Sequence, residues 1–189
     1  ILTQITIPSS VTSIGNNAFF WCSLLTSITI PSSVTSLGQN PFAFCSSLKQ
    51  INVDPNNSQY VSYFDALFTK DKKTLICCAS KHERDTYTIL PSVTSIGHYA
   101  FCCCSLLINI VIPSSVTSIG DNAFSSCSSL KQITFPSSLT SIGDNAFSYC
   151  GSLEQITIPS SVISIRDNAF SDCTSLTQIT IPRSVTSIG

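Results

Sequence analysis

Ten cysteines are the residues of this 189-residue chain with the widest chemistry, since thiols can serve as nucleophiles, metal ligands or disulfide partners. Six of them share one position of a repeating pattern: Cys22, Cys45, Cys104, Cys127, Cys150 and Cys173. Side chains that share a repeat position stack in parallel about 4.8 Å apart. A disulfide needs Cβ atoms at roughly 3.5–4.5 Å with converging directions. We therefore predict a ladder of buried free thiols.

The two histidines could in principle support metal or acid–base chemistry. His98 lies four residues before Cys102-Cys103-Cys104, but this spacing lacks the Cys-x-x-Cys pairing of structural zinc sites. His82 lies in the charged segment 81–85, where we expect a solvated turn. No serine has the context of a nucleophile elbow. We predict no catalytic residue, no metal, no cofactor and no enzymatic activity.

The cysteines are positioned by a unit of 23 residues. Each unit opens with a leucine: Leu2, Leu25, Leu48, Leu107, Leu130, Leu153 and Leu176. The Ile-x-Ile alternation that follows predicts a short strand, which should end at a proline such as Pro113. A second short strand over 116–119 should end at a glycine in a left-handed turn, followed by one helical turn over Ala123-Phe124. A row of asparagines (Asn17, Asn40, Asn122, Asn145, Asn168) is interpreted as capping the backbone groups of these turns.

A unit this short cannot bury a core alone, so neighbouring units must stack. The sequence therefore predicts a repeat solenoid, with a curved parallel β-sheet on the concave side and short strands and turns on the convex side. We expect one domain over 1–189, with eight inner strands that start near the seven leucines and near Thr74.

One step between leucines is irregular, because 59 residues separate Leu48 from Leu107. We interpret the segment 48–106 as two rungs with a protrusion, in which Ala66–Thr69 and Thr74–Cys78 form a hairpin. Residues 54–85 hold 10 of the 19 charged side chains. The chain rejoins the repeat over 86–96.

Composition narrows the choice of partners. Charged residues make up 10% of the chain, where about 25% is usual, and the net charge is −1. Nucleic acid is not expected as a partner, because phosphate binding needs clustered Lys and Arg. No apolar run is long enough to span a membrane. The chain starts and stops inside units without polar caps, so we expect a fragment of a longer array whose ends are candidate surfaces for end-to-end self-association.

The unit Leu-x-x-Ile-x-Ile-Pro-x-x-Val-x-x-Ile-Gly-x-x-Ala-Phe-x-x-Cys resembles the BspA-like, or treponemal, leucine-rich repeat, and the stretch Asn56-Asn57 to Ile76 is similar to a variant unit of that family. The resemblance covers essentially the whole chain. It implies a leucine-rich repeat solenoid from a bacterial or protist surface protein, cell-surface or secreted, and a role in adhesion. It brings no catalytic residues.

Polar rows on the predicted concave face suggest how such a module would bind. Outward positions form a glutamine row beside a threonine row: Gln132, Thr134, Gln155, Thr157, Gln178 and Thr180 continue the pattern of Gln4, Thr6, Thr29 and Gln50. If the inserted strand places Ile76 and Cys78 inward, Leu75 and Cys77 point outward beside Ile108 and Val111. These four apolar residues are a candidate anchor for a partner, or a small core covered by the charged insert.

These observations predict a non-catalytic interaction module of a cell-surface adhesin, which binds a host or matrix protein or a glycan through its concave face. Two alternatives remain open. Threonine ladders could bind ice or another lattice, although the mixture of glutamine with threonine and the curvature oppose it. A metal-dependent hydrolase is the other, although no constellation of acid, base and metal ligands supports it.

Overall fold

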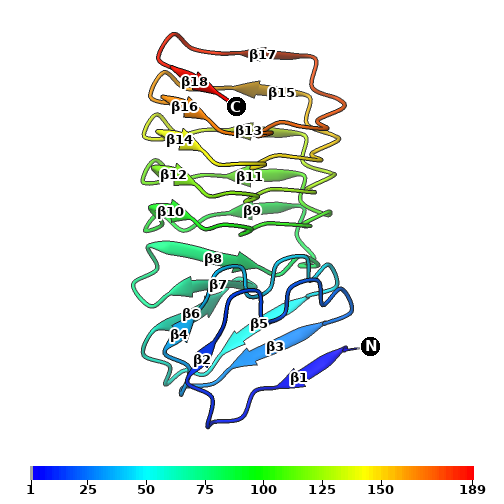
Figure 1. Ribbon diagram of the computed structural model, residues 1–189, viewed down its shortest axis with the longest axis vertical. Coiled ribbons are helices and arrows are strands. Elements are labelled where there is room, and N and C mark those ends of the chain that lie inside the picture. The colour runs from blue at the N-terminus through cyan, green and yellow to red at the C-terminus, as the bar shows by residue number, and fades with distance from the viewer. Residues whose placement is uncertain (1) are drawn as a thin grey trace.

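The computed structural model describes residues 2–189 and is a β-solenoid in which each unit forms one rung (Figure 1). The first strand of each rung forms one series: β1 (Gln4–Thr6), β3 (Ser27–Ile30), β5 (Gln50–Val53), β9 (Thr86–Thr88), β11 (Asn109–Val111), β13 (Gln132–Thr134), β15 (Gln155–Thr157) and β17 (Gln178–Thr180). The second strands form another: β2 (Ser13–Ile14), β4 (Ser36–Leu37), β10 (Ser95–Ile96), β12 (Ser118–Ile119), β14 (Ser141–Ile142), β16 (Ser164–Ile165) and β18 (Ser187–Ile188). The predicted solenoid is confirmed. Residues 2–189 contain no helix that could cross a membrane.

Neighbouring rungs pair in parallel with a register of one unit. Gln132 of β13 lies opposite Gln155 of β15, and Ile133 lies opposite Ile156. Equivalent side chains therefore stack on one another, with isoleucine buried and its neighbours exposed. This alternation explains why one short pattern suffices to extend a core from rung to rung.

Both strand series are interrupted where the insert enters. The first-strand series divides into β1-β3-β5 and β9-β11-β13-β15-β17, and no pairing joins β5 to β9. The insert supplies β6 (Tyr60–Tyr63), β7 (Ala66–Thr69) and β8 (Thr74–Cys78), which form an antiparallel meander. The hairpin over 66–78 is thus present as predicted.

The expected inner strand near Thr74 is wrong. The position between β5 and β11 is filled by β9, whereas β8 extends the second-strand sheet and pairs with β10, so that Leu75 lies opposite Ile96. The expected protrusion is also wrong for most of this segment. Ala66, Leu67, Phe68 and Leu75 are fully buried, because the two sides of the hairpin are both apolar.

The hairpin β7–β8 separates two hydrophobic cores. Leu67 and Cys77 pack with the N-terminal rungs in a cluster that includes Leu25 and Leu48. Phe68 and Leu75 pack with the C-terminal rungs. The insert is therefore an internal partition, and Figure 1 shows it between the lower and upper stacks of rungs.

Turns connect the second strand of each rung to the next rung. The predicted helical turn over Ala123-Phe124 is absent. Backbone bonds between rungs hold these turns, as where Phe124 N donates to Ala146 O at 2.8 Å. Asn145 has a φ of 52°, and all five asparagines of the row share this left-handed conformation. Asparagine tolerates positive φ better than other side chains do, which explains the row more directly than capping.

The expectation of a left-handed glycine after the second strand is wrong, because no glycine has positive φ. A Cβ at Gly120 would lie 2.7 Å from the backbone N of His98 in the preceding rung. Glycine is needed there for the close approach of rungs.

Candidate functional site

The predicted polar rows form one exposed face of the first-strand sheet. Gln132, Gln155 and Gln178 are exposed and lie in register, as do Thr134, Thr157 and Thr180. None of the side-chain hydrogen bonds found among residues 2–189 uses these six groups. We call this surface the glutamine–threonine face.

Other hydroxyl rows are occupied in holding the rungs together. Thr140 Oγ1 donates to Thr117 O at 3.1 Å, and Ser138 Oγ donates to Val116 O at 2.6 Å. The same bonds recur one unit away, where Thr117 Oγ1 donates to Thr94 O and Ser115 Oγ donates to Val93 O. The serines and threonines at these two positions, between the proline and the second strand, therefore serve the fold.

The predicted apolar anchor is only partly present. Leu75 is 0% and Cys77 is 8% exposed, so the expectation that they point outward is wrong. They belong to the second-strand sheet and pack into opposite cores, which leaves them little contact with solvent. Val111 is 52% exposed and Ile108 is half-buried.

A shallow hollow lies beside Val111 at the edge of the glutamine–threonine face. Its volume is about 360 Å³, and its lining includes Ile110, Val111, Thr134 and Phe135. An apolar floor with a threonine at its edge suits an aliphatic or aromatic group of a partner.

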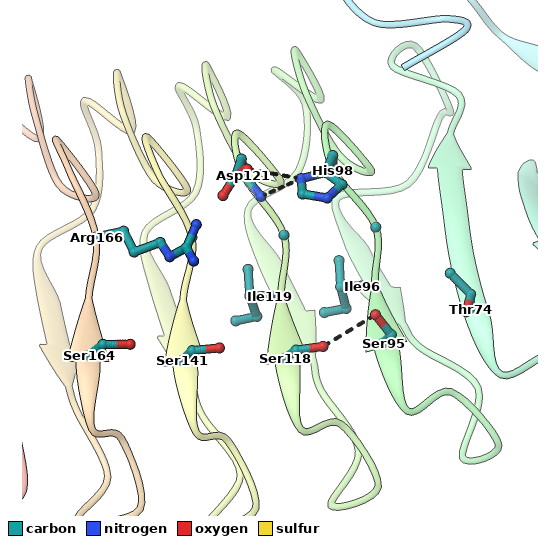
Figure 2. Close-up of a pocket in the computed structure, with 13 residues that line it drawn as sticks. Thr74, Ser95, Ile96, His98, Ser118, Ile119, Asp121, Ser141, Ser164 and Arg166 are labelled. Atoms are coloured by element: carbon teal, nitrogen blue, oxygen red, sulfur yellow. Dashed lines mark hydrogen bonds and ion pairs between the residues drawn. The ribbon is translucent and has the colours of Figure 1, made fainter. Parts of the chain in front are cut away.

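A longer groove follows the second-strand sheet (Figure 2). Its volume is about 410 Å³, and a row of hydroxyl residues runs along it: Thr74, Ser95, Ser118, Ser141 and Ser164. Ser118 Oγ donates to Ser95 Oγ at 3.2 Å.

His98, Asp121 and Arg166 lie on the turns beyond the serines of this groove, as Figure 2 shows. His98 Nδ1 accepts the backbone N–H of Asp121 at 3.0 Å and lies 3.2 Å from its carboxylate Oδ2. Ser118 thus bonds Ser95, while His98 bonds the next rung. The groove offers hydrogen-bonding groups but does not join a serine nucleophile to a base.

An exposed aromatic cluster on the turn side was not predicted from the sequence. The rings of Trp21 and Phe44 stack with centroids 4.9 Å apart, and Phe20 and Tyr99 pack edge-on against Phe44. Trp21 is 64% exposed. Trp21 and Phe44 occupy the repeat position of Ser126, so a comparison of side-chain size at each exposed position would have found them.

Cys45, Cys104, Cys127 and Cys150 of the cysteine ladder are buried, and Cys22 and Cys173 at its ends are half-buried. Several of these thiols donate hydrogen bonds to backbone carbonyls. Cys127 Sγ donates to Phe101 O at 3.0 Å and Cys150 Sγ donates to Phe124 O at 3.2 Å, each reaching back 26 residues. Burial raises the pKa of the Cys45 thiol to about 12. Because a thiol of such pKa is protonated at neutral pH, it is a poor nucleophile. All ten cysteines are unpaired in the structure.

The two histidines lie in different environments. His98 is exposed, whereas His82 is only 2% exposed, so the prediction of a solvated turn at His82 is wrong. The ring of His82 packs against Tyr87, with centroids 5.8 Å apart. Local sequence offered no sign of this burial, because 81–85 is rich in charge.

Similarity to known proteins agrees with this architecture. The family described as "BspA type Leucine rich repeat region" matches residues 1–80 and 89–189, with six copies of the repeat. The chain belongs to this family. The BspA-type resemblance expected from the repeat unit is therefore confirmed. The comparison with curated protein sequences found no match.

Solved structures of bacterial proteins share the BspA-type fold. A leucine rich cell surface protein of Faecalibacterium prausnitzii has a TM-score of 0.90 and 37% identity, over 96% of this chain and 48% of that one. The pneumococcal vaccine antigen PcpA has a TM-score of 0.71 and 25% identity, over 87% of this chain and 51% of that one. The leucine rich repeat protein of T. pallidum has a TM-score of 0.54 and 27% identity, over 99% and 73%. This BspA-type chain thus spans about half the length of the first two proteins.

Proposed function

We propose that this chain is a non-catalytic interaction module of a cell-surface adhesin, which binds a host or matrix protein or a glycan through the glutamine–threonine face. The observation that carries the proposal is that the side chains of this face make none of the hydrogen bonds found among residues 2–189. Its glutamine and threonine side chains are exposed and in register, whereas the serine and threonine rows that precede the second strands bond neighbouring rungs.

The chemistry of this face suits a polar partner with an apolar contact point. Glutamine amides can donate and accept, and threonine adds a hydroxyl and a methyl group at each rung. The hollow beside Val111 adds an apolar pocket of the kind that anchors a protein side chain or a sugar ring. Many weak contacts along the rungs would then add over a long surface.

The proposed location at a cell surface is supported by relatives. The similar protein from F. prausnitzii is described as a leucine rich cell surface protein, and PcpA is described as a vaccine antigen. Neither description names a ligand, so the partner must be found by experiment.

The test is a pair of double variants on the same two rungs. Thr134→Lys with Thr157→Lys places two ammonium groups on the proposed face, and Ser137→Lys with Ser160→Lys places them on exposed residues just beyond it. Wild type and both variants are applied to immobilised collagen, fibronectin and laminin and to a glycan array. We expect binding to be lost with the threonine pair and kept with the serine pair.

Thermal unfolding of both variants is the control for folding, since exposed substitutions change stability by no more than about 0.5 kcal/mol. Equal binding by both variants would show that the face is not the binding surface. Failure of the wild type to bind any of these probes would contradict the adhesin role.

A further inference from the structure

Three buried side chains with metal-binding atoms meet where the insert joins the cysteine ladder. Cys78 and Cys104 contribute their sulfurs and His82 a ring nitrogen, and these atoms all lie within 4.8 Å of one another. Their side chains are 1%, 0% and 2% exposed. This is the one such group found among residues 2–189.

Cys78 occupies the place that phenylalanine holds in neighbouring rungs. Its backbone N donates to Ala100 O, just as Phe101 N donates to Ala123 O and Phe124 N to Ala146 O in the following rungs. The stacked row of Phe101, Phe124, Phe147 and Phe170 therefore stops at Cys78. A thiol in place of a ring leaves space beside the ladder, and the imidazole of His82 lies there.

Cys104 differs from the ladder cysteines that follow it in the group next to its sulfur. Cys127, Cys150 and Cys173 each donate a hydrogen bond to the carbonyl of a phenylalanine 26 residues earlier. For Cys104 that residue is Cys78. Cys104 thus meets a second thiol, and no such carbonyl bond is found for its sulfur within residues 2–189.

One ring nitrogen of His82 lies within 4.8 Å of both sulfurs. Its Nδ1 accepts the backbone N–H of Arg84 at 3.3 Å, and its Nε2 is buried without a hydrogen-bond partner. A buried polar atom without a partner is destabilising and calls for an explanation. An ion bound between Nε2 and the two sulfurs would supply one.

We propose that Cys78 Sγ, Cys104 Sγ and His82 Nε2 bind a thiophilic metal ion, Zn²⁺ with a water as fourth ligand. Both thiols lose their protons to solvent, and the two thiolates balance the charge of the dication. The imidazole proton moves to Nδ1, which gives up the long bond from Arg84. Zinc–sulfur and zinc–nitrogen distances of about 2.3 and 2.1 Å bring the ligands to roughly 3.8 Å apart, so side-chain rotation closes the site.

One of the three proposed ligands, His82, lies at the wall of a surface hollow. The hollow has a volume of about 330 Å³, and its lining also includes Lys49, Asp65, Lys81 and Glu83. A hydrated ion can enter this hollow. The ligand set also suits Cu⁺, because thiolates favour soft ions.

The test is titration of the reduced protein with Co²⁺, whose thiolate charge-transfer and d–d absorption bands report ligand type and geometry. We expect saturation at a single ion per chain, displacement by Zn²⁺, and no bands with Cys78→Ser. The matched control is Cys127→Ser, which removes a buried ladder thiol outside the site and should keep the bands. Competition between Zn²⁺ and Cu⁺, read by metal content, distinguishes the two ions.

His82→Gln is a second variant of similar side-chain size, which tests the site even if Cys78→Ser does not fold. Circular dichroism shows whether each variant is folded. A folded His82→Gln protein should bind Co²⁺ much more weakly and lose the increase in melting temperature that Zn²⁺ gives wild type. Absence of the bands in wild type would overturn the proposal. So would a mass lower by two hydrogens that maps to a Cys78–Cys104 disulfide under the conditions of metal binding.

Discussion

At the scale of single residues, position in the rung decides what one residue type does. Thr140 bonds the preceding rung, whereas Thr134, six residues earlier, presents its hydroxyl to solvent. Cys127 donates to a carbonyl, whereas Cys104 faces a thiol and an imidazole. The chemistry of a residue in this solenoid therefore follows from its neighbours one rung away.

The asparagine row gives a prediction at this scale. Asn145 has a φ of 52°, so Asn145→Ala should destabilise the protein by about 1–2 kcal/mol through steric strain in the left-handed region. Asn145→Gly relieves the strain and should cost much less. Urea unfolding of the three proteins measures the difference. If the glycine variant were as unstable as the alanine variant, the side chain of Asn145 would matter through hydrogen bonding instead.

At the scale of elements, the hairpin β7–β8 is the part of the molecule that breaks the repeat and also joins its two halves. It replaces the missing pairing between β5 and β9 with side-chain packing on both of its sides. Antiparallel pairing lets a short turn connect the two strands, and their apolar residues on both sides suit a buried layer. The charged turn 70–73 stays at the surface.

Two leucines on opposite sides of this hairpin give a matched pair of variants. Leu67 packs into the N-terminal core and Leu75 into the C-terminal core, and both are fully buried. Each change to alanine should cost about 2–5 kcal/mol. The fluorescence of Trp21, the single tryptophan, reports the N-terminal stack.

We expect Leu67→Ala to shift the Trp21 transition to lower urea by more than Leu75→Ala does, while circular dichroism follows both stacks. If fluorescence and circular dichroism gave the same urea midpoint in both variants, the hairpin β7–β8 would couple the two stacks into a single cooperative unit.

At the scale of the whole molecule, the solenoid is a one-dimensional stack in which each rung contacts its neighbours. Its low charge leaves hydrogen bonds between rungs and apolar burial as the main sources of stability. The C-terminal stack from β9 to β18 repeats with one register throughout.

This regularity predicts which deletions the molecule tolerates. Removal of residues 121–143 takes out one unit of 23 residues and joins Gly120 to Asp144 in register. We expect a folded protein with the same circular dichroism per residue and a modestly lower melting temperature. Removal of 121–132 puts a strand where a turn is needed and should abolish cooperative unfolding of the C-terminal stack. Equal melting of both deletion proteins would contradict stacking in a fixed register.

The sequence by itself determined the period, the family, the buried and exposed positions of each regular rung, and the glutamine and threonine rows. These features follow from the alternation of apolar and polar residues within the unit. Because the unit recurs many times, each copy supports the same conclusion. The cysteine ladder followed in the same way, since equivalent residues must stack.

Only the tertiary structure decided the position of the insert, the burial of Leu75 and Cys77, and the meeting of His82 with Cys78 and Cys104. The insert has no period, so its apolar residues fit an exposed hairpin or a buried partition equally well from the sequence. The choice depends on which segments pack against it. Burial of a histidine within a charged stretch is likewise decided by contacts with distant rungs, which local composition does not record.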